Sequence, residues 1–572
     1  MKKKLLILLG IVVVAVTGGY LYLRYGVLKS EDFKADRSDA RSELDLRPPL
    51  IAKLQQLVKD GTKGLYILTI REIDPSLTEA TLDLRELELV VDSAVLARLD
   101  SMEMAPDNVY KVSLQHLNID GLGLKDLLSK KDIDLRSVEI ADPVIEVFST
   151  KRAYNVEEKD TLSLYEQINK ALNSVAIGAI NVKNATVISH RPGKKAVPTK
   201  YKGLNVMLKQ LLIDSTTQFD RDRFMFAKEA DIIMDKYSYR TADSLYFFNT
   251  GRINISATRN TLTAVDIELL PRHTRAKFQQ VNNVRKDRLH IKSSRLVLSG
   301  IDWWLLANTE NLIATRADIY GGSLADYIDK TKPAKKLNPA NYPHQALMTI
   351  DLPLAVSTVH IHDMDVTYDE YNPASGQTGT VSFTNTKGTI QNLTNMQSRI
   401  KKNRYMALQA DVMFMGSVPL NMELKFDLAK VKTGNFEARV NAGEMKHELL
   451  NKLSEPLGLF HLKRVHVKKV NAHLKGDNKK ASADFTLLYD DLYIVPLKKD
   501  DEKNGGLHQQ KMVGFLANLL KIKSSNPTKG NDARTYQYVV DRKAYPGFFT
   551  HLWKTILFGV IKTIGAPESL AK

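Results

Sequence analysis

Apolar and polar residues alternate with a period of two along most of the chain, from residue 65 to residue 497. Such alternation predicts β-strands with one face on an apolar interior and the other in water. Clear examples are Leu82/Leu84, Leu87/Leu89/Val91, Ile180/Val182, Leu204/Val206/Leu208, Val359/Ile361 and Leu420/Met422/Leu424/Phe426. Because helical spacing is rare between them, we expect a mainly β fold whose neighbouring strands pair mainly antiparallel.

Helical spacing is confined to a few short segments. Pro48 and Pro49 open the first, which carries Leu50, Leu54 and Val58 on one stripe. Four further segments predict helices, namely 161–172, 445–457, 512–522 and 546–566.

A weak internal repeat relates residues 110–147 to residues 289–326 without gaps, at an offset of 179. Each copy reads as a strand, a glycine turn, a short apolar segment and two further strands. Equivalent positions include Leu117 and Leu296, Ile119 and Leu298, Gly121 and Gly300, Leu122 and Ile301, and Ile140 and Ile319. A unit of this size cannot bury its apolar face alone, so stacked units are expected to enclose one continuous apolar interior. The predicted fold is an elongated, curled antiparallel β-sheet, shaped as a groove.

The N-terminal residues predict where in the cell the protein is located. Three lysines precede an uncharged, mostly apolar run over residues 5–23, which is long enough to span a bilayer. Lysines before such a run keep the N-terminus in the cytoplasm, so the bulk is expected to be exported, with a single-pass anchor in the inner membrane. The residues representing this anchor are Leu5, Ile11, Val14 and Leu23. A cleaved signal peptide is the alternative.

Four segments follow from these patterns. We expect a transmembrane anchor over 1–29, a linker and short helix over 30–64, a repetitive β domain over 65–497, and loops with amphipathic helices over 498–572.

Composition narrows the classes of partner. Among the 572 residues, 82 lysines and arginines oppose 65 aspartates and glutamates, and no cysteine is present. The excess of positive charge suits anionic lipid headgroups or other anionic polymers, although a solvated basic surface explains it equally simply. Export of the bulk argues against nucleic acid. The lack of cysteine excludes disulfides and thiol catalysis.

Catalytic motifs are scarce. His360 and His362 share one face of a predicted strand, as metal ligands often do, but no third ligand is evident and a wet-face location is the simpler interpretation. No metalloprotease, nucleophile-elbow or phosphate-loop signature occurs. We therefore expect a protein that is not an enzyme and needs no cofactor or metal. The pair Trp303 and Trp304 is expected to pack at the wall or rim of the sheet.

The C-terminal segment predicts an amphipathic helix. Its apolar residues recur at helical spacing, and they are Phe549, Leu552, Trp553, Ile556 and Val560. Such a helix either lies on a membrane surface with Trp553 near the headgroups, or caps the apolar end of the sheet. The cap is slightly favoured.

Several stretches resemble AsmA-like proteins, the relatives of TamB and of the bridge-like lipid-transfer proteins. They are GLYILTIREIDPSLTEATLDLRELELVVD at 64–92, LNIDGLGLKDLLSKKDIDLRSVEIADPVIEV at 117–147, FTNTKGTIQNLTN at 383–395, ADVMFMGSVPLNMELKFDL at 410–428 and FFTHLWKTILFGVIKTIG at 548–565. The resemblance implies an apolar β-groove anchored in the inner membrane, with a role in moving phospholipid toward the outer membrane. Some members are tied instead to outer-membrane protein assembly.

Two functions follow as hypotheses. The first is an apolar groove that binds or conducts phospholipid for outer-membrane lipid homeostasis, with acyl chains against inward side chains. Its candidate lining residues are Leu117, Ile119, Leu122, Ile140, Leu296, Leu298, Ile301 and Ile319. The second is a non-enzymatic scaffold that binds outer-membrane or envelope proteins through sheet edges.

Overall fold

The computed structural model describes residues 47–567, except residues 77, 122–131, 151, 156–172, 191–197, 218, 225, 242, 334–340, 500–505, 510–521 and 543–546. Strands make up 58% of the described residues and helices 17%, so the prediction of a mainly β protein with few helices is confirmed. The anchor residues Leu5, Ile11, Val14 and Leu23, the lining candidate Leu122, and the predicted helices at 161–172 and 512–522 lie outside the described residues.

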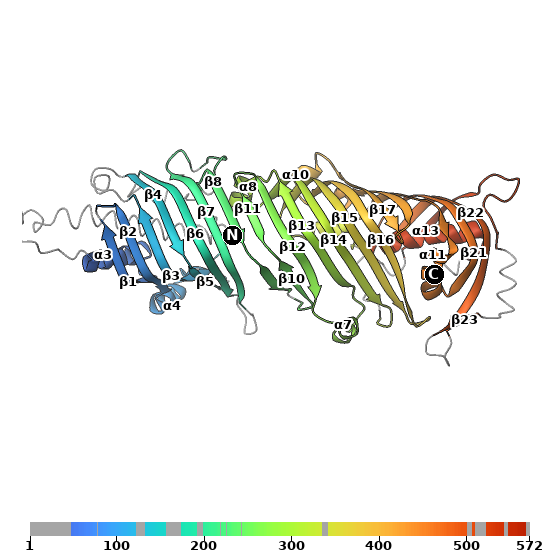
Figure 1. Cartoon of the computed structure of the whole chain (residues 1–572), viewed down its shortest axis with the longest axis horizontal. Coiled ribbons are helices and arrows are strands. Elements are labelled where there is room, and N and C mark those ends of the chain that lie inside the picture. Colours follow the sequence, from blue (N-terminus) through green and yellow to red (C-terminus); the bar gives the residue numbers. More distant parts are fainter. Residues whose placement is uncertain are drawn as a thin grey trace, which may run out of the picture. The chain divides into compact units, whose positions relative to one another are not determined.

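The chain divides into two compact units (Figure 1). Unit 1 comprises residues 1–237, 251–262 and 303–309, and unit 2 comprises residues 238–250, 263–302 and 310–572. The elements mainly in unit 1 are α3 (Arg47–Gly61), β1 (Tyr66–Ser76), β2 (Thr81–Val91), α4 (Ser93–Ser101), β3 (Asn108–Asp120), β4 (Asp132–Ala141), β5 (Val144–Ser149), β6 (Ser174–His190), β7 (Thr199–Ile213), β8 (Glu229–Met234), β11 (Ile253–Ser256) and α8 (Trp303–Thr309).

Unit 2 holds the remaining elements. They are β9 (Tyr237–Arg240), β10 (Tyr246–Thr250), β12 (Thr261–Pro271), α7 (Arg275–Val281), β13 (Arg288–Ser299), β14 (Leu312–Asp329), α9 (Pro343–Leu347), β15 (Leu354–Asn372), β16 (Gln377–Thr394), α10 (Gln397–Ile400), β17 (Tyr405–Phe414), β18 (Val418–Asp427), η2 (Leu428–Lys430), β19 (Phe436–Ala442), β20 (Met445–Lys446), α11 (His447–Gly458), β21 (Phe460–Gly476), β22 (Lys480–Lys499), β23 (Leu507–Gln509), β24 (Thr535–Asp541) and α13 (Phe548–Ile564). The predicted helices at 445–457 and 546–566 are confirmed as α11 and α13, and the helix opened by the two prolines is confirmed as α3.

Strand pairing is mainly antiparallel, as predicted, but the sheet is mixed and not antiparallel throughout. β6 runs parallel to both β4 and β5, and β15 runs parallel to β14. Parallel neighbours need a long crossover connection, and β6 and β15 each follow a long stretch of chain after the preceding strand ends.

The internal repeat is larger in the structure than in the sequence. Strands β1 to β7 with α4 (the first copy) match β10 and β12 to β16 with α7 (the second copy), and β14 takes the place of both β4 and β5. The pairing registers also match, since Leu117 lies opposite Ile140 where Leu296 lies opposite Ile319. The parallel pairing repeats too, because Ile140 faces Val182 as Ile319 faces Ile361.

Backbone irregularities recur at an offset of 179 or 180. Left-handed conformations occur at Glu86 and Asp266, at Gly121 and Gly300, at Asp142 and Gly321, and at Asn184 and Asp363. In both copies a tyrosine hydroxyl also accepts a bond from the third strand: Tyr66 from the Tyr110 amide and Tyr246 from the Leu289 amide, each at 3.2 Å. Because bulges and left-handed residues set strand register, these matches explain why the copies pair alike.

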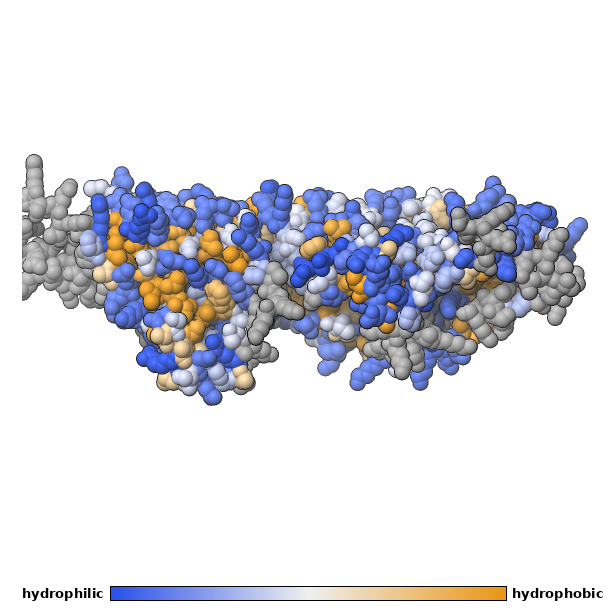
Figure 2. All heavy atoms as spheres, turned by 90° about the horizontal axis from the view of Figure 1, so that it is seen from below, coloured by the Kyte–Doolittle hydropathy of each residue, from blue (hydrophilic) through white to orange (hydrophobic). Residues whose placement is uncertain are grey.

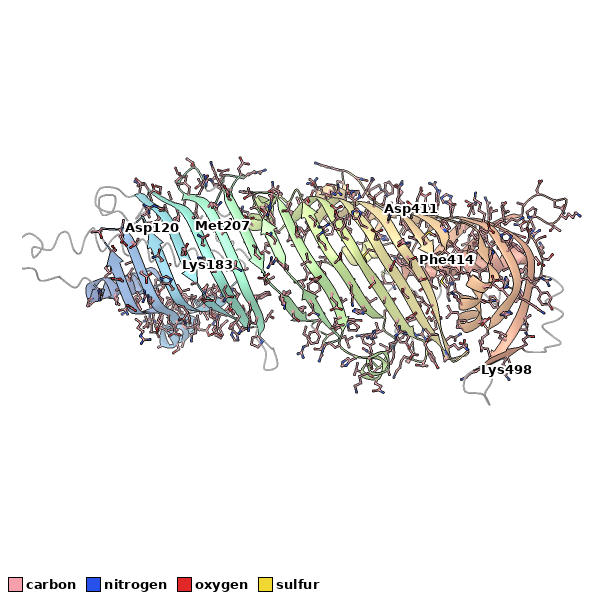
Figure 3. All side chains as sticks on the ribbon, viewed as in Figure 1. Asp120, Lys183, Met207, Asp411, Phe414 and Lys498 are labelled. Atoms are coloured by element: carbon pink, nitrogen blue, oxygen red, sulfur yellow. The ribbon has the colours of Figure 1, made fainter. Side chains whose placement is uncertain are left out.

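Alternation divides each sheet into an apolar and a polar face. On β17, Phe414 is buried and Asp411 is exposed, and Figure 3 labels both side chains. In unit 1 the polar face carries cross-strand ion pairs such as Arg136 with Asp120 at 2.9 Å and Lys183 with Glu139 at 3.1 Å. Within each unit, the alternation in the sequence therefore places apolar side chains on one face of the sheet and polar side chains on the other, as predicted.

Candidate functional site

The apolar face of unit 2 continues from strand to strand, although β-bulges shift the register between β15 and β16 and between β16 and β17. One row passes through Leu296, Ile319 and Ile361, and then through Gly388 and Ala410. A second row beside the first crosses the same strands and passes through Leu298, Ala317, Val359, Ile390, Leu408 and Leu424. Residues opposite one another on neighbouring strands share a face, so these rows form one apolar wall.

Helices cover only part of this wall. α11 packs on β16 and β21, and α13 packs on β22 and β24. Their shared core buries, among others, Leu424, Phe426, Phe436, Leu474 and Phe485. On β13 to β15, Ala317, Val356 and Val359 are buried, but eight other apolar side chains keep partial contact with solvent. We call these eight the open segment, and they are Leu289, Ile291, Leu296, Leu298, Ile319, Leu324, Ile361 and Val366.

The first copy differs from the second in exposure. Leu117 and Ile119 have no exposed surface and Ile140 has 1%, whereas their equivalents Leu296, Leu298 and Ile319 are half-buried. Ile301, at the turn after β13, is buried as well. Leu117 and Ile140 are brought together by strand register, as are Leu296 and Ile319. Of the candidate lining residues that the structure describes, only Leu296, Leu298 and Ile319 therefore present apolar surface.

Hydrophobic residues also gather on one side of unit 1. Figure 2 shows them over the part that carries β1 to β6 and α4 in Figure 1. In the same unit Ile67, Met102 and Met104 are exposed, and α4 buries none of its residues.

Asp326 interrupts the apolar wall of the second copy. It occupies the position of Val147 in the first copy and lies in register with Leu289 on one side and Tyr368 on the other. Its Oδ1 is buried without a hydrogen-bond partner. Burial, together with the nearby carboxylates of Asp287 and Asp369, raises the pKa of Asp326 to about 7.

We predict that Asp326→Asn stabilises the protein at pH 8 more than at pH 5. The folded-state pKa lies above that of the unfolded chain, so the aspartate weakens the fold as pH rises toward and beyond 7. The amide stays neutral throughout. Thermal unfolding followed at several pH values measures the difference, with the exposed Asp351→Asn as control. A melting-temperature gain that does not vary with pH would contradict the assignment.

The histidine pair of the predicted metal site lies on the polar face of β15. The His362 Nε2 is 3.0 Å from Asp318 Oδ1, and its ring stacks on Tyr320 at 4.5 Å. His360 contacts the Thr389 hydroxyl at 3.3 Å. The Arg316 guanidinium holds the pKa of Asp318 at about 2, so this carboxylate is tied into an ion pair. Among the described residues no group of three or more ligand side chains is arranged to hold a metal ion.

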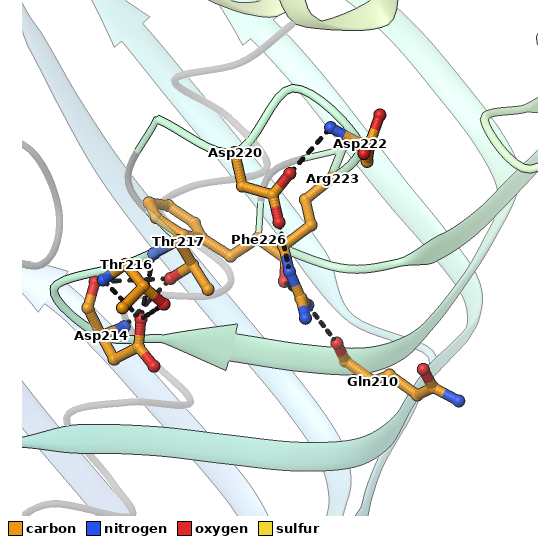
Figure 4. Close-up of polar contacts among 8 residues, drawn as sticks. All are labelled: Gln210, Asp214, Thr216, Thr217, Asp220, Asp222, Arg223 and Phe226. Atoms are coloured by element: carbon orange, nitrogen blue, oxygen red, sulfur yellow. Dashed lines mark hydrogen bonds and ion pairs between the residues drawn. The ribbon is translucent and has the colours of Figure 1, made fainter.

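The β7–β8 loop is held by its own polar contacts (Figure 4). The Asp214 carboxylate accepts bonds from the backbone amides of Thr216 and Thr217 at 2.8 and 3.0 Å, and Arg223 donates to the Gln210 carbonyl at 2.7 Å. These hydrogen bonds hold the β7–β8 loop in one conformation and so offset the conformational entropy that a long loop loses when it is ordered.

The fixed loop seats an aromatic pair. Phe224 lies edge-on to Trp303 with ring centroids 5.8 Å apart, and both side chains are buried. Trp304 lies under the Arg221 guanidinium at 4.9 Å. Trp303 is thus a packing residue of unit 1, as the sequence predicted.

A buried polar cluster lies in the C-terminal core. Tyr342 is fully buried, and its hydroxyl is 2.9 Å from the Asp477 carbonyl and 2.7 Å from Nδ1 of His551. The Arg542 guanidinium stacks over the Tyr342 ring at 4.2 Å. His344 is also fully buried, stacks on Phe426 at 5.0 Å, and has no partner for either ring nitrogen.

Burial lowers the pKa of His344 and of His551 to about 4 each. Both rings are therefore neutral near pH 7. Tyr342 and His551 are 209 residues apart. Their contact joins α13 to the segment before α9, and no local pattern in the sequence announces it.

α13 has one face in the protein core and another that is partly exposed. Leu552 is buried in the C-terminal core with Phe548, whereas Phe549 and Trp553 are exposed, and Ile556 and Val560 are half-buried. The helix thus caps the core with one face and shows apolar residues on the other. Of the helices in the described part of the chain, none is long and apolar enough to cross a bilayer.

Comparison with known proteins gives no assignment: no protein-family model and no curated protein matches the chain. Function must therefore be argued from the apolar wall, the open segment and the surface of α13.

Proposed function

We propose that this chain is an AsmA-like protein of the cell envelope that binds or conducts phospholipid along its apolar wall. In this proposal the N-terminal run anchors it in the inner membrane, the bulk is periplasmic, and its role is outer-membrane lipid homeostasis. No catalysis and no cofactor are needed.

The observation that carries the proposal is the open segment. Eight apolar side chains on three neighbouring strands share one face and are only half-buried. Contiguous apolar surface of this kind is costly in water and marks a binding surface in soluble proteins. Acyl chains would be bound there by burial of hydrocarbon, at about 0.8 kcal/mol per buried methylene.

Lipid rather than protein is favoured by the chemistry of the wall. The rows through Leu296 and Leu298 present aliphatic side chains and alanine or glycine, with no hydrogen-bonding side chain at those levels. A protein strand would need backbone partners, whereas an acyl chain needs only apolar contact. The charged outer face keeps the sheet in water while its inner face holds hydrocarbon.

Site-specific photocrosslinking tests the proposal. Benzoylphenylalanine is introduced in the full chain at Leu298, on the apolar wall, or at Val297, its neighbour on the opposite face in register with Asp318. After irradiation of cells, mass spectrometry of the purified protein should find phospholipid adducts at position 298 and not at position 297. Equal yields or none at position 298 would refute lipid binding, and a defined protein adduct would favour the scaffold function.

A further inference from the structure

The inner face of α13 is locked to the sheet. Its buried residues pack against β22 and β24, and Tyr538 donates its hydroxyl to the Thr555 carbonyl at 2.8 Å. At Gly559 the helix approaches the sheet so closely that an added Cβ would lie 2.6 Å from the Phe485 ring. The orientation of the helix is therefore fixed, and its other face is fixed with it.

That other face carries an apolar stripe that is exposed at its N-terminal end. We define the α13 stripe as Phe549, Trp553, Ile556 and Val560, which recur at intervals of four, three and four. Ile556 and Val560 are half-buried and also contact the C-terminal core, so the exposed part of the stripe is its aromatic end. Phe549 is 60% exposed and Trp553 is 49% exposed. Exposed aromatic residues in a row on a rigid helix are unusual on a surface that has no partner.

The charges around the stripe are of one sign. Residues 548–564 contain no aspartate and no glutamate, and they include Lys554 and Lys562. Lys554 is exposed, and the Lys562 ammonium lies 5.7 Å from the centre of the Phe558 ring. A helix face that combines aromatic residues with lysines and lacks carboxylates is complementary to an anionic lipid surface.

We propose that the α13 stripe docks on the surface of a phospholipid bilayer that contains anionic lipid. Phe549 and Trp553 enter the headgroup boundary, where the amphipathic indole ring is favoured. The lysines meet phosphate groups while the opposite face of the helix stays in the protein core. The inference goes beyond lipid binding by the apolar wall, since it identifies a second place where the chain meets lipid.

The absence of cysteine allows a direct test on the full chain. A single cysteine at position 549 is labelled with an environment-sensitive fluorophore, and the chain is held in phosphatidylcholine nanodiscs. The matched control carries the label at Val539, which is 57% exposed on β24. Vesicles containing phosphatidylglycerol and a lipid-borne quencher are then added.

The expected result is quenching at position 549 and little at position 539. Quenching should fall about tenfold when Trp553→Glu is added and severalfold in high salt, because both apolar insertion and charge attraction contribute. Val539→Glu should leave it unchanged. Equal quenching at both positions, or none with phosphatidylglycerol, would overturn the proposal.

A protein partner would give a different outcome, since quenching would then be absent with pure lipid vesicles. Lipid adducts at Leu298 report on the apolar wall and do not involve α13, so failure of membrane docking is distinguishable from failure of the proposed function. Circular dichroism of each variant shows whether the fold is retained.

Discussion

Leu117→Asp and Leu296→Asp, at equivalent positions of the two copies, are expected to fail in different ways. Leu117 has no exposed surface and lies between Leu84 and Ile140 on neighbouring strands. A carboxylate there is buried without a partner, so unit 1 should lose about 4 kcal/mol or more of stability. Hydrogen exchange over β2 to β4 should show the loss of protection.

Leu296→Asp should leave the fold in place and remove lipid. Its side chain is half-buried, so a carboxylate at this position can reach water. The expected cost in stability is about 1 kcal/mol. Adducts at Leu298 should fall about tenfold, because a charge in the wall repels hydrocarbon.

Val297→Asp is the control, since it places the same charge on the opposite face of the same strand. If Leu296→Asp unfolds unit 2 as fully as Leu117→Asp unfolds unit 1, the contrast between a closed and an open copy is wrong. Unchanged adducts in folded Leu296→Asp would count against the apolar wall as the binding surface.

Mild acid should loosen the C-terminal core. His344 and His551 are buried as neutral rings with pKa values near 4, below the 6.5 of an unfolded histidine. Their contribution to stability is complete above pH 6.5 and declines as pH falls toward 4. Each ring accounts for up to about 3 kcal/mol over this window.

The surrounding charges act in opposite directions. Asp427 favours protonated His344, whereas Arg542 opposes protonation of His551 beside Tyr342. Neither charge changes the pKa of its histidine as much as burial does, so both pKa values are lowered. Protection of α13 amides against hydrogen exchange should therefore fall between pH 6.5 and 4.5.

The variant His344→Leu isolates one ring. Because neither nitrogen of His344 has a partner, the variant removes no hydrogen bond and should be nearly neutral at pH 7.5. It should, however, reduce the acid-induced loss of stability by about half. An unaltered pH profile would show that His344 is not one of the groups responsible.

Much of the fold was predictable because strand alternation is a local signal. The period of two identifies which side chains share a face, and the offset of 179 relates Leu117 to Leu296 before any coordinates are known. Parallel pairing of β14 with β15 was missed, since nothing in the strands themselves records the direction of the crossover.

The openness of the second copy could not be predicted. Leu117 and Leu296 have the same chemistry and the same register, and only packing on the wall separates them. One difference between the copies is visible in the sequence, because their alignment places Asp326 at the position of the apolar Val147. The contact of Tyr342 with His551 depends on how α13 folds back, which local periodicity does not encode.

The matching registers of the two copies have a consequence for how the chain tolerates change. Strand order in each copy is fixed by backbone bonds and by left-handed residues at equivalent points, such as Asp142 and Gly321. The inner side chains of the second copy therefore contribute little to fixing the strand order. Substitutions among them should therefore change the apolar surface of the second copy without changing its strand order, whereas substitutions in the buried interior of the first copy should destabilise the sheet itself.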